Sequence, residues 1–200
     1  MKTDALILAG GNSSRMGGQH KGSLLWHGKS FTELMVRELK KRADTVYLSC
    51  GRQAVPDTSG CIAVQDIYPG CGPIGGLHAG LKKSTADFVL TAPCDMPLLK
   101  AELYDFLLSF LTGEPSGGSS GMPDAVVPLL DRRPEPLAAV YRPSCSLFFE
   151  QQLKTGCYRL RPALDRMHVV YPDISENPQL ASMMENINSP ADYASLLEKK

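Results

Sequence analysis

The chain has no excess of charge of either sign. Its 200 residues carry 21 Lys and Arg against 21 Asp and Glu, so it lacks the basic surplus of a general nucleic-acid binder. An anionic ligand must therefore be met by positive charge that the fold gathers locally. Apolar residues make up 43% of the chain and charged residues 21%, which is typical of a soluble globular protein with a sizeable core.

Three further absences narrow the class of protein. No two of the six cysteines are spaced as C-x-x-C, so neither a zinc ribbon nor a redox dithiol is indicated, and we expect reduced thiols. The first apolar run is too short for a signal peptide, and no segment approaches the length of a membrane span. The four histidines do not cluster at ligand spacing. We expect a cytoplasmic protein that contacts neither nucleic acid nor membrane.

Short apolar runs alternate with amphipathic stretches along the chain. We predict strands at residues 4–9, 45–49, 61–65, 87–92 and 168–171, and helices at 30–42, 74–83, 100–111, 144–153, 158–165 and 189–200. This alternation predicts a layered α/β fold with a mostly parallel sheet. Two extended pieces flank DRRPE at 131–135, which predicts a hairpin and makes the sheet mixed.

Residues 112–124 (TGEPSGGSSGMPD) are rich in Gly, Ser and Pro. We interpret them as a mobile surface loop, because both flanks have the pattern of regular structure. A domain boundary there would leave too little chain on either side. We therefore expect one domain over residues 1–200.

The first predicted strand ends in LILAGG, and a cationic stretch follows it. Ligands of open α/β sheets sit beyond the carboxyl ends of the strands, which makes this loop the expected place for one. Gly10 and Gly11 let the backbone approach a ligand and direct N–H groups at an anion. Arg15 and Lys21 add positive charge, and together these residues predict binding of nucleotide phosphates. The alternative is a surface loop with two solvated cations.

Two glycine motifs elsewhere point to other phosphate sites. GKS at 28–30 resembles the end of a P-loop, but position 23 is Ser where that motif needs Gly, so we interpret GKS as a turn and helix cap. GCGPIG at 70–75 fits G-x-G-x-x-G, and Asp95 follows it where a dinucleotide fold places its ribose-binding acid. Four residues separate this motif from the preceding strand, and Pro73 sits inside it. A dinucleotide-dependent oxidoreductase is the minority alternative.

Acidic residues follow two of the predicted strands. Asp95 lies between two prolines in PCDMP, and a carboxylate that faces a phosphate loop suits Mg²⁺, which takes one or two carboxylates plus phosphate oxygens. An ordinary turn is the alternative for Asp95. Asp66 ends the strand at 61–65 and lies on the same side, and the glycines that follow it could wrap a substrate closely.

These stretches, in this order, resemble the molybdenum cofactor guanylyltransferase family, whose members join a nucleotide to the phosphate of molybdopterin. The pattern comprises L-A-G-G-x-S-x-R-M-G with a later Lys, Asp before G-P-[LI]-x-G-[LI], P-C-D-M-P, P-L-x-A-[VL]-Y and N-x-N-[TS]-P. Here these motifs lie at 8–21, 66–77, 93–97, 136–141 and 186–190. The opening motif is shared by the wider nucleotidyltransferase superfamily. The later motifs narrow the resemblance to the molybdenum cofactor guanylyltransferase family within it.

The resemblance implies a three-layer Rossmann-like nucleotidyltransferase fold and transfer of GMP from GTP to molybdopterin with release of pyrophosphate. It implies that the nucleotide is bound by Leu8, Ala9, Gly10, Gly11, Lys21, Ser49, Asp66 and Asp95. It places Gly72, Pro73, Gly75, Asn186 and Asn188 near the second substrate. Asp95 would bind Mg²⁺, and with Arg15 and Lys21 it would neutralise charge that builds on the triphosphate. Transient contact with proteins that deliver molybdopterin, or with molybdoenzymes, is a further expectation.

One position departs from the family pattern. The family places an Asn at the end of the second predicted strand, where this chain has Ser49, whose hydroxyl is shorter and lacks the paired donor and acceptor of an amide. CTP in place of GTP is therefore an alternative, as is a sugar 1-phosphate as the acceptor. A module that senses GTP without transferring it is the non-enzymatic alternative.

Overall fold

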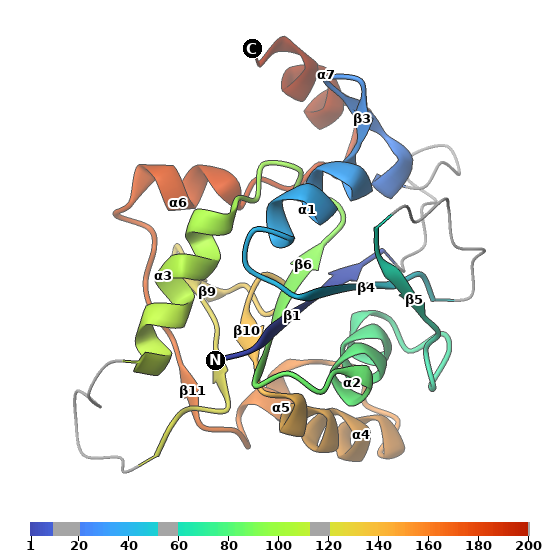
Figure 1. Ribbon diagram of the computed structural model, residues 1–200, viewed down its shortest axis with the longest axis vertical. Helices are drawn as coiled ribbons and strands as arrows, with labels where there is room; N and C mark the ends of the chain where they lie inside the picture. The colour runs from blue at the N-terminus through green and yellow to red at the C-terminus, as the bar shows by residue number, and fades with distance from the viewer. Residues whose placement is uncertain (10–20, 52–59, 113–120, 200) are drawn as a thin grey trace.

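A computed structural model describes residues 1–9, 21–51, 60–112 and 121–199. Seven strands form the central sheet in the order β11-β7-β10-β6-β1-β4-β5 (Figure 1). They are β1 (Thr3–Leu8), β4 (Thr45–Ser49), β5 (Ile62–Val64), β6 (Phe88–Pro93), β7 (Ala125–Val126), β10 (Val140–Tyr141) and β11 (Val169–Val170). Of these seven, β10 alone runs antiparallel to its neighbours. The predicted mixed, mostly parallel sheet is confirmed.

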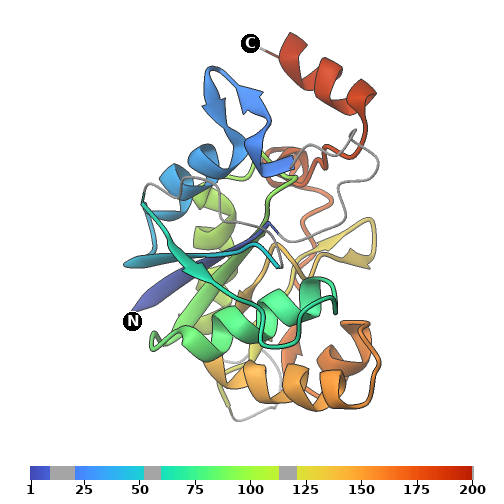
Figure 2. The same ribbon diagram turned by 90° about the vertical axis from the view of Figure 1, so that its right-hand side faces the viewer.

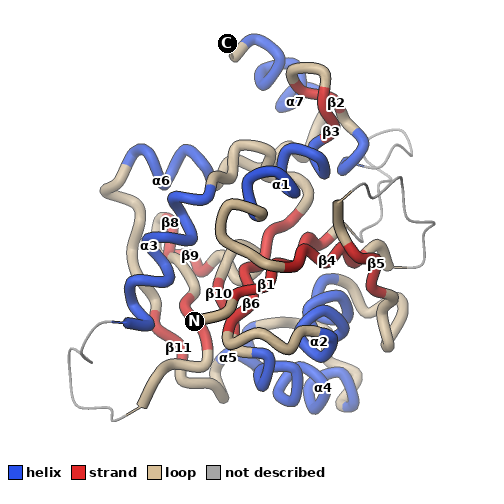
Figure 3. The backbone as a smooth tube through the Cα atoms, viewed as in Figure 1, coloured by secondary structure: helices blue, strands red, loops and turns tan. Residues whose placement is uncertain are grey.

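Helices cover both faces of this sheet (Figures 1 and 3). One face carries α1 (Phe31–Leu39), α3 (Ala101–Thr112) and α6 (Pro178–Met183), and the other carries α2 (Pro73–Lys83), α4 (Ser146–Lys154) and α5 (Arg161–Leu164). Successive side chains of a strand point to opposite faces. Accordingly Ala5 and Ile7 of β1 join the core on the α1 side, while Leu6 and Leu8 join the core on the α2 side. The predicted three-layer arrangement is confirmed.

Helix α2 packs its backbone directly on the central strand. A Cβ at Gly80 would lie 2.3 Å from a side-chain carbon of Leu6, and one at Gly76 would lie 2.7 Å from Ser49 Oγ. Positions four apart share one face of a helix, so these two glycines form the contact surface. Because they lack side chains, Gly76 lies against the ends of β1 and β4, at Leu8 and Ser49, and Gly80 lies against the middle of β1 at Leu6.

The GKS motif at 28–30 is structural, as predicted. Strands β2 (Leu25–Trp26) and β3 (Lys29–Ser30) form a hairpin whose central residues, His27 and Gly28, both have positive φ, at 49° and 74°. Such a two-residue turn matches the twist of paired strands. Ser30 then caps α1 in a reciprocal capping box with Glu33.

The predicted hairpin around 131–135 is also present. β8 (Leu129–Leu130) and β9 (Arg133–Pro134) flank a tight turn in which Asp131 and Arg132 have φ of 50° and 64°. The turn itself occupies only these two residues, so Glu135 lies beyond it. The hairpin extends from the strands β7 and β10, which pair with each other in the central sheet.

Several predicted elements differ in extent. The predicted helix at 158–165 is reduced to α5, and a short 3-10 turn (Pro143–Cys145) precedes α4. Helix α6 was not predicted, because it spans only six residues; Asn177 caps it by accepting the N–H of Leu180. Residues 113–120 of the predicted mobile loop lie outside the described part of the chain. Among the residues that are described, no helix is long and apolar enough to cross a membrane.

The C-terminal helix α7 (Pro190–Glu198) packs on the β2–β3 hairpin at one end of the molecule (Figure 2). Ser189 caps it and Pro190 occupies its first turn. A separate small core holds the two together, comprising Leu24, Phe31, Ile187 and Leu196. The Tyr193 hydroxyl also donates a hydrogen bond to the Leu25 carbonyl oxygen at 2.7 Å. We call α7 and this hairpin the C-terminal cap.

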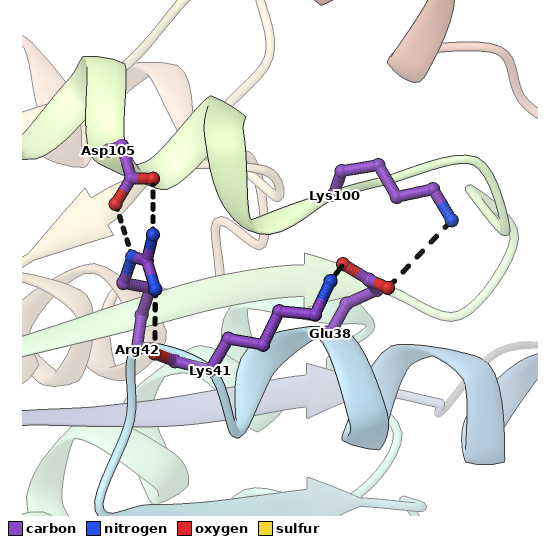
Figure 4. A network of polar contacts seen from close by, with 5 residues as sticks. All are labelled: Glu38, Lys41, Arg42, Lys100 and Asp105. Carbon is purple, nitrogen blue, oxygen red and sulfur yellow. Dashed lines mark hydrogen bonds and ion pairs between the residues drawn. The ribbon is translucent and has the colours of Figure 1, made fainter.

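A polar network ties Glu38 of α1, and Lys41 and Arg42 just after this helix, to Lys100 and to Asp105 of α3 (Figure 4). The Arg42 guanidinium donates two hydrogen bonds to the Asp105 carboxylate, one of them 2.8 Å long. These hydrogen bonds lower the pKa of Asp105. The Glu38 carboxylate accepts a hydrogen bond from the Lys41 ammonium at 2.7 Å, and its other oxygen lies 3.9 Å from the Lys100 ammonium.

Candidate functional site

The parallel strands β1, β4 and β6 end together at one edge of the sheet. Ala9 donates its N–H to the carbonyl oxygen of Ser49 at 2.8 Å, and Cys94 donates to that of Leu8 at 3.1 Å. These bonds extend the pairing of the sheet one residue past the ends of β1 and β6. The segments that follow the strands therefore emerge side by side, which is where an open α/β sheet places its ligand.

Three polar side chains converge on the β6 side of this edge. The Lys21 ammonium donates to Asp95 Oδ2 at 3.0 Å and to Asn188 Oδ1 at 2.5 Å. Lys21 begins a 3-10 turn (Lys21–Ser23), Asp95 follows β6 and Asn188 precedes α7. The Lys21 and Asp95 side chains are 20% and 23% exposed, so the pair is open to a ligand and still shielded from full solvation.

The segment 186–188 is held against the PCDMP stretch through its main chain. The N–H of Ile187 donates to the carbonyl oxygen of Asp95 at 2.8 Å, and the Ile187 side chain is buried. Asn186 and Asn188 are exposed on either side of it. Asp192 accepts the N–H groups of Asn188 and Ser189 at 2.9 and 2.8 Å, and these bonds lower its pKa.

A second polar group lies on the β4 side of the same edge. The Ser49 hydroxyl donates to Asp66 Oδ1 at 2.8 Å. Burial raises the pKa of Asp66, against the hydrogen bond from Ser49, which lowers it. Gly75 brings the start of α2 against this group, because a Cβ there would lie 2.9 Å from the Tyr68 carbonyl oxygen and 3.4 Å from Asp66 Oδ2. Gly72 and Pro73 begin the helix, and Gly72 has a φ of 72°.

The predicted site residues thus fall into two groups that flank β1. Lys21, Asp95 and Asn188 form one, and Ser49, Asp66 and the start of α2 form the other. Leu8 and Ala9 lie between them at the end of β1, because the strand order is β6-β1-β4-β5. Gly10, Gly11 and Arg15 lie outside the described residues.

The family model for the MobA-like NTP transferase domain matches residues 5–170. The chain belongs to the MobA-like NTP transferase family. A probable molybdenum cofactor guanylyltransferase of Halalkalibacterium halodurans is 31% identical over 194 residues, which cover 94% of both chains. A molybdenum cofactor guanylyltransferase of Yersinia pestis is 31% identical over 189 residues, 94% of this chain and 91% of the relative.

Solved structures share the fold of this MobA-like NTP transferase. Molybdopterin-guanine dinucleotide biosynthesis protein A from Archaeoglobus fulgidus superposes with a TM-score of 0.76 at 24% identity, covering 98% of this chain and 97% of the other. The 2-C-methyl-D-erythritol 4-phosphate cytidylyltransferase from Thermus thermophilus superposes with a TM-score of 0.69 at 15% identity, covering 98% of each. The predicted nucleotidyltransferase fold is confirmed.

The topology of this MobA-like NTP transferase argues against a dinucleotide fingerprint at 70–75. In that fingerprint the glycine turn and the acidic residue follow neighbouring strands. Here the turn follows β5 and Asp95 follows β6, and β4 and β1 lie between these two strands. Asp95 instead contacts Lys21, which precedes the cap.

Sequence reasoning missed Glu135, which follows the β8–β9 hairpin and directly precedes the PLAAVY motif. Its side chain is partly buried. Burial raises the pKa of Glu135, Arg133 lowers it, and the negative charge of Asp95 raises it further. Glu135 therefore adds to the acidic side of the site in this MobA-like NTP transferase. Its place directly before the PLAAVY motif was the available signal.

The Asp95 carboxylate suits a divalent cation such as Mg²⁺, most of whose ligands would come from the substrate. The described residues include no group of three or more His, Cys, Asp or Glu that could hold a metal ion. Asp95 does hold a cation, the Lys21 ammonium, on one carboxylate oxygen. Magnesium commonly uses one or two carboxylates and completes its shell with phosphate oxygens and water. This MobA-like NTP transferase has that partial donor set.

Proposed function

We propose that this protein is a molybdenum cofactor guanylyltransferase that transfers GMP from GTP to the phosphate of molybdopterin. The observation that carries this proposal is the convergence of Lys21, Asp95 and Asn188 at the carboxyl edge of the sheet. Relatives named for the activity are 31% identical to the chain over more than nine-tenths of its length. The site pairs a cation for phosphate with a carboxylate for a metal ion, as nucleotidyl transfer requires.

The reaction is an in-line displacement at phosphorus. A phosphate oxygen of molybdopterin attacks the α-phosphorus of GTP and forms a new P–O bond. The bond from the α-phosphorus to the bridging oxygen breaks, and pyrophosphate leaves with its electron pair. Because the nucleophile is already anionic, the main barrier is repulsion between the two substrates. The protein lowers that barrier by placing positive charge at the triphosphate.

Lys21 supplies this charge within the described part of the chain, and Arg15 with the Gly10 and Gly11 amides would add to it from the first loop. Asp95 would hold Mg²⁺, which supplies charge neutralisation at the triphosphate when bound. Asp66 would contact the guanosine from the β4 side. Asn186, exposed beside the buried Ile187, would meet the pterin substrate.

The decisive experiment incubates the purified protein with molybdopterin, Mg²⁺ and either GTP or CTP. We expect pyrophosphate release and formation of molybdopterin guanine dinucleotide with GTP, and much slower transfer with CTP. Ser49 makes the comparison necessary, because its hydroxyl is engaged by Asp66. Faster transfer from CTP would make the protein a cytidylyltransferase. Binding of GTP without pyrophosphate release would make it a nucleotide sensor.

The same proposal includes the organisation of the protein. Residues 1–200 would form one nucleotidyltransferase domain that works in the cytoplasm. We further propose transient contacts with proteins that deliver molybdopterin and with molybdoenzymes. Pull-down of the purified chain with each class of partner tests this part separately from the transfer assay.

A further inference from the structure

The contact between Lys21 and Asn188 joins the nucleotide side of the site to the C-terminal cap. A lysine ammonium has three N–H donors and accepts nothing. One donor is directed at Asp95 Oδ2 at 3.0 Å and one at Asn188 Oδ1 at 2.5 Å. The two contacts hold the ammonium at a defined place. Neither of them uses its third donor, which can meet a phosphate oxygen.

We propose that Asn188 is a positioning residue for the nucleotide: its amide oxygen holds the Lys21 ammonium where the triphosphate binds. This role is additional to the contact with the second substrate that the family pattern implies. It rests on the proposed function, in which Lys21 is a ligand of the triphosphate.

The chemistry of the amide suits this task. A carboxylate at position 188 would also hold the ammonium, but it would add a further negative charge to those of Asp95 and Asp192, which already act on Lys21. That arrangement would repel a triphosphate. A neutral amide oxygen fixes the ammonium and leaves its charge available. Asn188 therefore orients Lys21 without cancelling it.

The backbones that carry both partners are fixed independently of their side chains. Gly22, next to Lys21, is buried against α1, and its carbonyl oxygen accepts the Thr32 hydroxyl at 3.0 Å. Ile187, next to Asn188, is tied to Asp95. Holding both ends in place lowers the entropy cost of ordering the Lys21 side chain when a ligand binds. The inferred contribution of Asn188 is therefore to nucleotide affinity.

The substitution Asn188→Ala isolates this contact. The N–H of residue 188 still donates to Asp192, the capping of α7 by Ser189 does not involve the Asn188 side chain, and Ile187 stays buried. Among the hydrogen bonds of the described residues, the substitution removes only that from Lys21 to the amide oxygen. Thermal unfolding should show an unchanged midpoint within about 2 °C.

The test is a double-mutant cycle on GTP affinity, measured by calorimetry with Mg²⁺ and without molybdopterin. We expect Asn188→Ala to weaken GTP binding roughly three- to tenfold in the wild-type background. In the Lys21→Met background, the same substitution should change the affinity by less than about twofold. Lys199→Met is the matched control: it removes a lysine at the end of α7 that pairs with Glu185, and GTP affinity should not change.

Each outcome bears on the inference. An equal loss in both backgrounds, or no loss in either, would overturn it, because Asn188 would then act without Lys21 or serve the second substrate alone. A wild-type protein that does not bind GTP would overturn the proposed function and this inference with it. If the wild-type protein binds GTP but Asn188→Ala has the same effect in both backgrounds, the proposed function stands and only the role of Asn188 is refuted.

Discussion

Asp95→Asn separates the chemistry of the site from the stability of the fold. The substitution keeps an oxygen acceptor for Lys21 and keeps the backbone carbonyl that accepts the N–H of Ile187. It removes only the negative charge. We expect nucleotidyl transfer to fall by about 10³-fold or more, because neither a metal ion nor Lys21 would then face a carboxylate.

The expected cost in stability is small and follows from the geometry. At 3.0 Å, the Coulomb attraction between unit charges is about 1 kcal/mol in bulk water and about 6 kcal/mol at an effective dielectric of 20. The side chains are 20% and 23% exposed, and desolvation and side-chain entropy offset most of this attraction. We expect a net loss of about 1 kcal/mol in the free energy of unfolding, or about 2–4 °C in Tm for a chain of this size.

The assay pairs pyrophosphate release with thermal unfolding, and Asp105→Asn is the matched control. Asp105 is also the acid of an ion pair between distant segments, with Arg42 (Figure 4), but it lies outside the site. The control should lose a similar amount of stability and keep its transfer rate. Full activity of Asp95→Asn, or an equal loss of activity in both variants, would refute the placement of Asp95 at the centre of the reaction.

Two further predictions concern the fold around the site. Gly80→Ala should destabilise the protein by about 1–3 kcal/mol in urea unfolding, because its Cβ would lie 2.3 Å from the buried Leu6 side chain; Gly121→Ala, with nothing within 4 Å, should be neutral. His78 is fully buried, its ring nitrogens have no hydrogen-bond partner among the described residues, and burial lowers its pKa. The unfolded chain then binds a proton at higher pH than the folded chain, so stability should fall as pH drops below about 6.5. His78→Leu should lose less stability than the wild type between pH 7 and 5, and parallel pH profiles would contradict this account.

The layers and the ligand edge of the sheet were predictable because their signals are local. A strand buried on both faces needs a continuous apolar run, and ALILA at 5–9 supplies one. The capping box at Ser30 and Glu33 lies within four residues, and the structure contains it. Parallel strands bring their carboxyl ends to one edge, which predicts that Asp66 and Asp95 lie on the same side of the sheet.

The pairing of side chains within the site was not predictable, because it depends on packing between distant segments. Lys21 and Asn188 are 167 positions apart, and their contact depends on how α7 docks on the β2–β3 hairpin. The periodicity of the sequence indicated α7, but the hairpin has strands of two residues, too short to show alternation. Glu135 was missed for the same reason, because it follows the β8–β9 hairpin, whose strands are also only two residues long.

In a chain with no net charge, a highly charged substrate must be met by cations held in place locally, and the C-terminal cap holds one of them, Lys21. Lys21 precedes the hairpin and Asn188 precedes α7, so the apolar core beneath the cap fixes both members of the contact. A change in that core, at Ile187 for example, would therefore alter the position of a cation that it does not touch. Nucleotide affinity in this protein should accordingly depend on the packing of its last helix as well as on the residues that meet the triphosphate.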